Sequence, residues 1–456
     1  MRPCALAIAV ACLGAAFAAQ AQEANSADNA GPILESIQVS SNLLGTSMAA
    51  STKNFAGART VVQKDDIENS GASSLSDVMR RIPGVQISDN SGSAGSAVSL
   101  NIGVRGLAGR YSPRSTVLLD GIPMSVAPYG QPQLSFAPVS LANVETVDVV
   151  RGGGAVRFGP QNVGGIINFK TRRVPTTPGI TGDASVRYNT YSEVGHNTQA
   201  SVFAGTQLDS GLGLAVLYSG IRGSDWRVGS DEKVNDFALK FRYDLSPTAE
   251  VYGKLSYYDV TSRTPGGLTA AQYKQDPFQN TRPTDFWSGE RKAFDIGYLN
   301  AISGTQEFEV RAYYNKSSRE STLISGKNLG HQPRNYETTA IEPRYTQRFM
   351  TGKVSQDVTV GYRYLAERAD EAIYNVVIAS GVRQAPTRFA DNATDAQAVY
   401  IDDKIAIDAW RITPGVRYEH IKTERYNHLP TDQQIELLNN KALPSLNVAY
   451  LLNNNV

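Results

Sequence analysis

Arginines are the residues of this chain whose type and placement point most directly to chemistry. Arg319 and Arg334 stand at the two ends of the segment 320–335, and Arg388 lies in the segment 370–395. The planar guanidinium donates two parallel hydrogen bonds to a carboxylate and stays charged at any relevant pH. The three arginines are therefore candidate ligands for an anion that carries several carboxylates. Two other interpretations stay open, in which they bind lipopolysaccharide phosphates or each pair with a nearby acidic side chain.

A second group of charges lies where the backbone can approach a neighbour closely. Arg105 and Arg151 each precede a glycine, and Glu145 lies one strand segment upstream of Arg151. Because glycine has no side chain, an arginine beside it at a strand end can reach a surface against which the backbone packs. Taken alone, these arginines are most simply interpreted as structural.

The sequence shows no clear motif for metal binding, phosphate binding or catalysis. The four histidines are scattered along the chain: His196, His331, His420 and His428. Without a His-x-His or Glu-x-x-His grouping, the sequence disfavours a metal centre built from protein ligands. The glycines at 152–154 lack the Lys-Ser/Thr pair of a phosphate-binding loop. No nucleophile and base occur in a recognised motif, so we expect a protein that is not an enzyme.

The N-terminus indicates an exported protein. Residues 1–21 combine Met1-Arg2, an apolar core and the small-x-small site Ala19-Gln20-Ala21, which is typical of a secretory signal peptide. Both cysteines, Cys4 and Cys12, lie in this segment, so the mature chain would contain no thiol and no disulfide. A net charge of +1 over 456 residues argues against a nucleic-acid partner. No later apolar run is long enough for a membrane helix.

Residues 41–175 are predicted to form an α+β domain. Short β-branched and leucine runs between Gly and Pro predict strands at Thr116–Leu119, Val144–Val150 and Ile166–Phe169. A helix is expected after Ser73 or Ser74 and before Pro83-Gly84, since apolar residues recur at a spacing of 3.6. A shorter helical turn is expected around Asp65-Asp66-Ile67.

Residues 180–456 have a different pattern, in which segments of about ten residues alternate apolar and polar side chains. One such segment places Phe237, Leu239, Phe241 and Tyr243 on one face and Asp236, Ala238, Lys240 and Arg242 on the other. A soluble β-sandwich also alternates, but its polar face seldom repeats so regularly over so many long strands. The pattern therefore predicts part of an antiparallel transmembrane β-barrel with about twelve strands.

The links between these strands are predicted to alternate between short and long. Tight links are expected at 208–211, 244–248, 303–306, 351–355 and 407–410, and long links near 221–233, 263–285, 320–335, 370–395 and 423–442. Strict alternation would place every long link on one side of the membrane, outside the cell. Arg319, Arg334 and Arg388 would then lie in or beside extracellular loops.

The stretch from Asn101 to Thr171 carries a family resemblance, especially APYGQPQLS and VVRGGGAVRFGPQNVGG. It resembles the plug domain of TonB-dependent outer-membrane receptors, and it is most similar to their ferric citrate receptor branch. PRNY at 333–336 and EPRY at 342–345 resemble that branch as well. The resemblance implies a plug inside a barrel of about 22 strands. Because only about twelve of these strands are expected here, the chain would be a C-terminally truncated fragment.

The resemblance also implies roles for particular residues. Substrate would be bound by Arg319, Arg334 and Arg388, and by Ser93 and Gln131 in plug loops.

The other implied role is mechanical. Arg105, Glu145 and Arg151 would lock the plug to the barrel wall, and the two arginines would do so by pairing with acidic residues of the wall.

A TonB box is expected within the polar lead-in of residues 22–40. The segment Leu34, Glu35, Ser36, Ile37, Gln38 and Val39 alternates and resembles such a box, which adds a strand to its periplasmic partner through its backbone. The alternative is that these residues form the first strand of the plug. The implied partner is the TonB–ExbB–ExbD complex of the inner membrane. The lead-in is too short for a separate signalling domain.

The implied function is energy-coupled uptake of a ferric chelate, with ferric citrate as the expected cargo. Iron would be held by its chelator, so no protein-bound cofactor is expected. The protein would be a monomer in the lipid of the bacterial outer membrane. Two alternatives stay open: the same transport with another siderophore, and a passive porin or surface adhesin.

Overall fold

The structure is a computed structural model that describes residues 55–87, 100, 102–107, 114–132, 134, 137–152, 156–159, 162–191 and 193–452. The predicted signal peptide 1–21, the lead-in 22–40 with its segment 34–39, and Ser93 lie outside the described residues. All described residues belong to one compact unit. None of the helices found in these residues has the length and apolar character needed to cross a membrane.

The plug is the α+β domain predicted for its part of the chain. Its elements are β1 (Ala58–Gln63), α3 (Lys64–Asn69), α4 (Leu75–Arg80), β2 (Val85–Ile87), β3 (Ile102–Val104), β4 (Ser115–Leu119), β5 (Ile122–Pro123), η1 (Leu141–Asn143), β6 (Val144–Arg151), η2 (Val156–Phe158) and β7 (Gly165–Thr171). The main sheet has the order β1-β6-β7-β4-β5, in which only β4 and β7 are parallel. All three predicted strands are confirmed.

The plug core forms where α4 packs on this sheet. Ser74 begins the helix as predicted: its hydroxyl accepts a hydrogen bond from the Asp77 N–H, and the Asp77 carboxylate accepts one from the Ser74 N–H. Burial alone would raise the pKa of Asp77, but hydrogen bonds from Ser73 and Ser74 outweigh it and lower the pKa. Val78 and Met79 of the helix belong to the same buried hydrophobic cluster as Val149 and Phe169 of the sheet.

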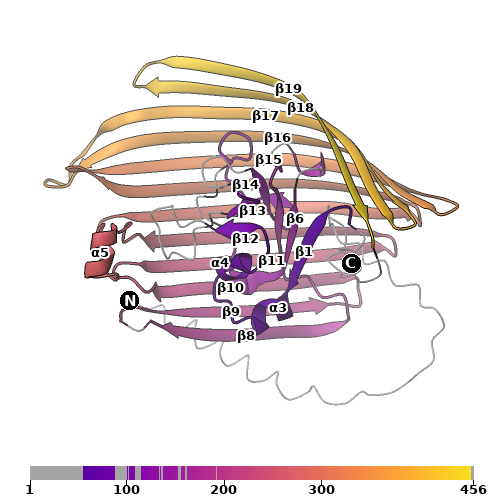
Figure 1. Cartoon of the computed structure of the whole chain (residues 1–456), viewed down its shortest axis with the longest axis horizontal. Coiled ribbons are helices and arrows are strands. Elements are labelled where there is room, and N and C mark those ends of the chain that lie inside the picture. The colour runs from indigo at the N-terminus through magenta and orange to yellow at the C-terminus, as the bar shows by residue number, and fades with distance from the viewer. Residues whose placement is uncertain are drawn as a thin grey trace, which may run out of the picture. The chain divides into compact units, whose positions relative to one another are not determined.

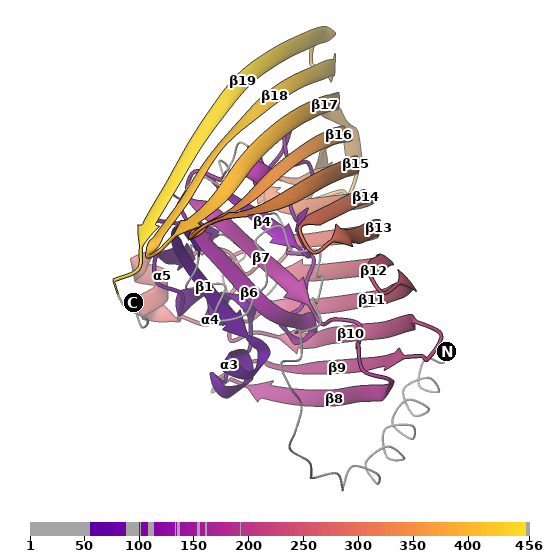
Figure 2. The ribbon, with the colours of Figure 1, turned by 90° about the vertical axis from the view of Figure 1, so that its right-hand side faces the viewer.

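Twelve antiparallel strands form the second part of the fold, in simple sequence order from β8 to β19. They are β8 (Gly179–Thr190), β9 (His196–Gln207), β10 (Leu212–Ser224), β11 (Asp231–Ser246), β12 (Ala249–Arg263), β13 (Phe286–Ser303), β14 (Gln306–Ser325), β15 (Asn328–Thr351), β16 (Val354–Val377), β17 (Arg383–Ile407), β18 (Trp410–Leu429) and β19 (Gln433–Tyr450). The plug elements lie against one face of this sheet, which curves around them (Figures 1 and 2).

The two faces of the sheet differ as the alternation predicts. On β11, Asp236 and Ala238 are buried toward the plug, whereas Phe237 and Tyr243 are exposed on the opposite face. A period of two residues along each strand produces this division, since successive side chains point to opposite faces. The apolar outer face is typical of a barrel that faces lipid.

The tight links are confirmed, but three predicted loops are wrong. β14 and β15 continue through the segment 320–335 and are joined by a turn between Ser325 and Asn328. The segments 370–395 and 423–442 are likewise mostly strand, with α5 (Ala270–Gln275) lying in the long link 264–285. Ladder hydrogen bonds need only backbone groups, so strands with polar residues on both faces can pair beyond the apolar zone. These hairpins resemble loops in composition only.

Candidate functional site

Arg319 and Arg334 form the centre of a polar site on the inner face of the sheet. Because β14 and β15 make a hairpin, the two arginines lie directly opposite each other in register. Arg319 is 5% exposed, and its guanidinium lies 4.6 Å from the centroid of the Trp287 ring. This distance permits a cation–π interaction. The two arginines are thus brought together on paired strands and not on a loop.

Gln131 of the plug contacts Arg334 in this site, and its part in binding substrate stays a prediction. Its Oε1 accepts hydrogen bonds from Arg334 Nη1 at 3.2 Å and from the Tyr336 hydroxyl at 2.8 Å. A group bound here would contact the plug and the barrel wall together. A movement of Arg334 when a group binds can therefore shift Gln131 and the plug loop that carries it.

Two residues that sequence reasoning missed complete the site. The Glu371 carboxylate accepts a hydrogen bond from Arg425 Nη2 at 2.7 Å and lies 3.5 Å from Arg334 Nε. Both residues were hidden in segments predicted to be loops. The signal that could have found Arg425 is parity, because it continues the inward-facing alternation of Arg417 and Glu419 along β18.

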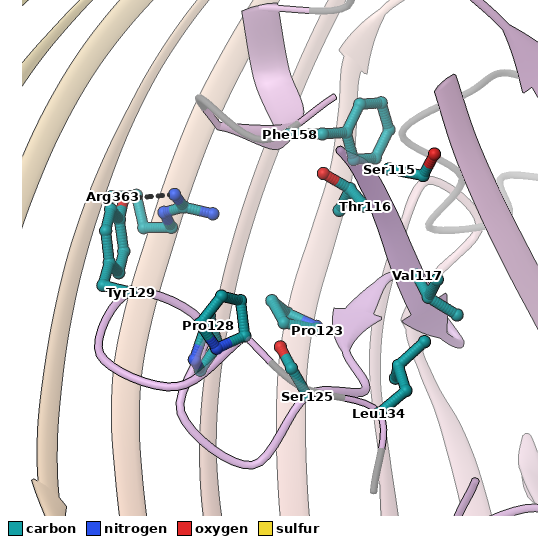
Figure 3. Close-up of a pocket in the computed structure, with 11 residues that line it drawn as sticks. Ser115, Thr116, Val117, Pro123, Ser125, Pro128, Tyr129, Leu134, Phe158 and Arg363 are labelled. Carbon is teal, nitrogen blue, oxygen red and sulfur yellow. Dashed lines mark hydrogen bonds between the residues drawn. The ribbon is translucent and has the colours of Figure 1, made fainter. Parts of the chain in front are cut away.

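The loop that carries Gln131 is held by the barrel wall. Glu367 accepts hydrogen bonds from the backbone N–H groups of Tyr129 at 2.8 Å and Gly130 at 2.9 Å. The Tyr129 hydroxyl donates to Glu419 and accepts from Arg363, as Figure 3 shows for the arginine. Burial raises the pKa of this hydroxyl; Arg363 opposes the shift and Glu419 adds to it. Three side chains of the barrel wall, Glu367, Glu419 and Arg363, therefore hold the loop that carries Gln131.

A small cavity lies beneath this loop. Ser115, Pro123, Tyr129, Phe158 and Arg363 are among its lining residues (Figure 3), and its volume is about 30 Å³. That volume suits about one water molecule. The cavity is therefore too small for a chelate. The candidate binding site remains the arginine site, which is formed by Arg319, Arg334 and Gln131.

Asp120 is a second anchor between plug and barrel. It has a φ of 51°, and its carboxylate accepts hydrogen bonds from Lys254 Nζ at 2.6 Å and from the Thr171 N–H at 2.7 Å. Arg311 donates to its carbonyl oxygen at 2.6 Å. Burial alone would raise the pKa of Asp120, but Lys254 and Lys240 outweigh it and hold the pKa well below its usual range. The anchor therefore stays ionised.

A third anchor is the buried pair of Arg157 and Asp402. Arg157 Nε donates to Asp402 Oδ2 at 2.6 Å, and Nη2 donates to Oδ1 at 2.5 Å, which makes the pair bidentate. Nη2 also donates to Thr359 at 2.9 Å. Burial alone would lower the pKa of Arg157, but Asp402 outweighs it and raises the pKa.

Breaking this pair is expected to loosen the plug. Arg157→Ala should lower the free energy of unfolding by about 3–5 kcal/mol, because Asp402 is left as a buried charge without its partner. The measurement is the urea concentration at which the plug loses protection from protease in detergent-solubilised protein. Adding Asp402→Ala should recover part of the loss.

A matched control is the exposed pair of Arg173 and Glu145. The Arg173 side chain is 65% exposed, so Arg173→Ala should change stability by about 0–1 kcal/mol. Equal urea midpoints for the Arg157→Ala and Arg173→Ala variants would contradict the anchor.

Arg151, Glu145 and Arg105 contact other parts of the plug. Arg151 donates to the Pro83 carbonyl oxygen at 2.7 Å, and Glu145 accepts from Arg173. The Arg105 guanidinium lies against Gly152, where a Cβ would come within 2.9 Å of it. The described contacts of these charges are thus within the plug and its link to β8. Their role as barrel locks stays a prediction.

Arg388 lies away from the other two predicted arginines in the sheet. Arg388 is exposed on β17, opposite Ile373 and beyond Ala390, which pairs with Glu371. Its part in the site stays a prediction, as does that of Ser93. Within the residues that the structure describes, no group of three or more His, Cys, Asp or Glu side chains is arranged to hold a metal ion.

Comparisons with known proteins cover most of the chain. The model of the TonB-dependent Receptor Plug Domain matches residues 51–166, and that of the TonB dependent receptor-like, beta-barrel matches residues 239–456. The chain is 26% identical to the vitamin B12 transporter BtuB of Vibrio vulnificus over 381 residues, which are 82% of this chain and 56% of that protein.

Solved structures show the same fold. The ferric citrate transporter FecA in its unliganded form is 42% identical, with a TM-score of 0.85 over 91% of this chain and 63% of that one. The siderophore receptor PiuA of Acinetobacter baumannii is 17% identical, with a TM-score of 0.69 over 86% of this chain and 62% of that one. The chain therefore spans less than two thirds of the length of each of these relatives.

Proposed function

We propose that this chain, which belongs to the family of TonB-dependent outer-membrane receptors, serves the energy-coupled uptake of a ferric chelate, and that the chelate is ferric citrate. The observation that carries the proposal is the convergence of Arg319, Arg334 and Gln131. Two opposed guanidinium groups present planar donors to carboxylates, and ferric citrate offers several carboxylates at once. The likeness to a structure described as a ferric citrate transporter supports the same cargo.

Binding in this proposal joins the barrel to the plug. Arg319 and Arg334 hold carboxylates of the chelate from the wall, and Gln131 contacts it from the plug. Iron remains within its citrate ligands, so the site needs only hydrogen-bond donors and positive charge. The arginines therefore select for a multivalent anion and not for iron itself.

Transport then requires the plug to move. The TonB–ExbB–ExbD complex pairs with the segment 34–39 and pulls on it. The anchors at Asp120, Tyr129 and Arg157 resist that pull until they separate in turn. The protein acts as a monomer in outer-membrane lipid and catalyses no reaction.

Ligand-dependent fluorescence tests the cargo. Because Trp287 lies beside Arg319, ferric citrate should quench tryptophan emission in a saturable way, whereas a ferric hydroxamate should not. Trp287→Phe should remove most of the quenching while radioactive ferric citrate still binds. Saturable binding of the hydroxamate, without binding of ferric citrate, would assign another siderophore.

A further inference from the structure

We propose that Glu371 is an internal carboxylate which occupies the arginine site in the empty protein and thereby excludes ligands that carry only one carboxylate. This inference rests on the proposed function in one respect: it takes the arginine site as the place where an anionic chelate binds. It adds a residue that determines specificity.

The contacts of Glu371 resemble those of a bound carboxylate ligand. One oxygen accepts from Arg425 Nη2 at 2.7 Å, and the other lies 3.5 Å from Arg334 Nε. The Glu371 side chain is 7% exposed, so this carboxylate is held in the site and does not extend into solvent. It bridges guanidinium groups from β15 and β18, two strands that are not neighbours in the sheet.

The site keeps capacity for a further anion. Within the described residues, Arg334 Nε donates no hydrogen bond, and Arg334 Nη1 reaches Gln131 only at 3.2 Å. A short bidentate contact between Arg334 and a ligand carboxylate would replace two long contacts.

Competition between carboxylates gives the specificity. Glu371 is tethered to the site, so its effective concentration there is on the order of millimolar or more. A ligand with one carboxylate gains only what Glu371 already provides and cannot displace it at ordinary concentrations. A chelate with several carboxylates displaces Glu371 because it engages Arg319 and Gln131 as well.

The test is the Glu371→Gln variant of the intact protein in detergent, with acetate as the competitor of bound ferric citrate. The variant keeps the size of the side chain and removes its charge. We expect the inhibition constant of acetate to fall roughly tenfold or more, since the loss of one charge-assisted contact frees the arginines. The dissociation constant of ferric citrate should fall by a similar factor, because the chelate has to displace the same carboxylate. Glu371→Asp, which keeps the charge on a shorter stem, should give an intermediate inhibition constant.

Glu337→Gln is the matched control. Glu337 lies on β15, the strand that pairs with the strand of Glu371, but it forms an ion pair with Lys316, whose side chain is 58% exposed. This variant should leave the inhibition constant of acetate unchanged. An acetate constant that is unchanged or higher in both Glu371 variants overturns the inference, because Glu371 would then only support the arginines.

Separate measurements test the identity of the cargo and the role of Glu371. If the wild-type protein shows no saturable response to ferric citrate, the proposed cargo is wrong. Direct titration with acetate, monitored through Trp287, then still decides the inference: tighter acetate binding by Glu371→Gln than by wild type supports it, and equal binding overturns it.

Discussion

Ferric citrate uptake is expected to fall to the level of a strain without the protein, while surface binding persists, when residues 34–39 are deleted. The segment LESIQV would add a strand to the periplasmic partner through its backbone, so its loss removes the point at which force is applied. The binding residues belong to β14, β15, β18 and the loop that carries Gln131, which the deletion leaves intact. The measurements are uptake of radioactive iron by whole cells and fluorescence quenching of the purified protein.

A deletion of equal length provides the control. Residues 24–29 lie in the same polar lead-in but do not alternate, so their removal should leave most of the uptake. Uptake that survives deletion of 34–39 would remove the coupling role from this segment. It would favour a passive porin, the alternative that needs no energy input.

Replacing both Arg319 and Arg334 with alanine is expected to weaken ferric citrate binding by about 100-fold or more. A hydrogen bond to a charged group contributes about 1.5–3 kcal/mol, and each 1.4 kcal/mol is about tenfold in affinity. Lysine at both positions should give an intermediate loss, because an ammonium group keeps the charge but not the planar fork. Equilibrium binding of ferric citrate measures both variants.

The control for this pair lies on the same hairpin. Lys316 on β14 is exposed on the opposite face of the sheet and pairs with Glu337, so Lys316→Ala should leave the affinity unchanged. Circular dichroism of each variant checks that the sheet is retained. A double alanine variant that is folded and binds ferric citrate as tightly as wild type does would contradict the site.

The fold was largely predictable because its signals are local. Alternation along β11 identified its inner and outer faces, and Ser74 with Asp77 marked the start of α4. The family resemblance carried by 101–171 is confirmed by the plug-domain model, which matches residues 51–166. The ends of the long hairpins were not predictable, because polar residues on both faces of a strand give no apolar period. Their pairing depends on neighbouring backbones, which composition does not reveal.

The sequence by itself determined the kind of chemistry: arginines on strands whose side chains alternate between two faces, with both cysteines in the first 12 residues and no metal-binding motif. Only the tertiary structure decided which arginines act together. Arg334 and Gln131 are 203 residues apart, and Arg425 and Glu371 are 54 apart. Their meeting depends on the register of four strands and on the docking of the plug. A period of two residues assigns each side chain to a face, but the register across strands determines its neighbours there.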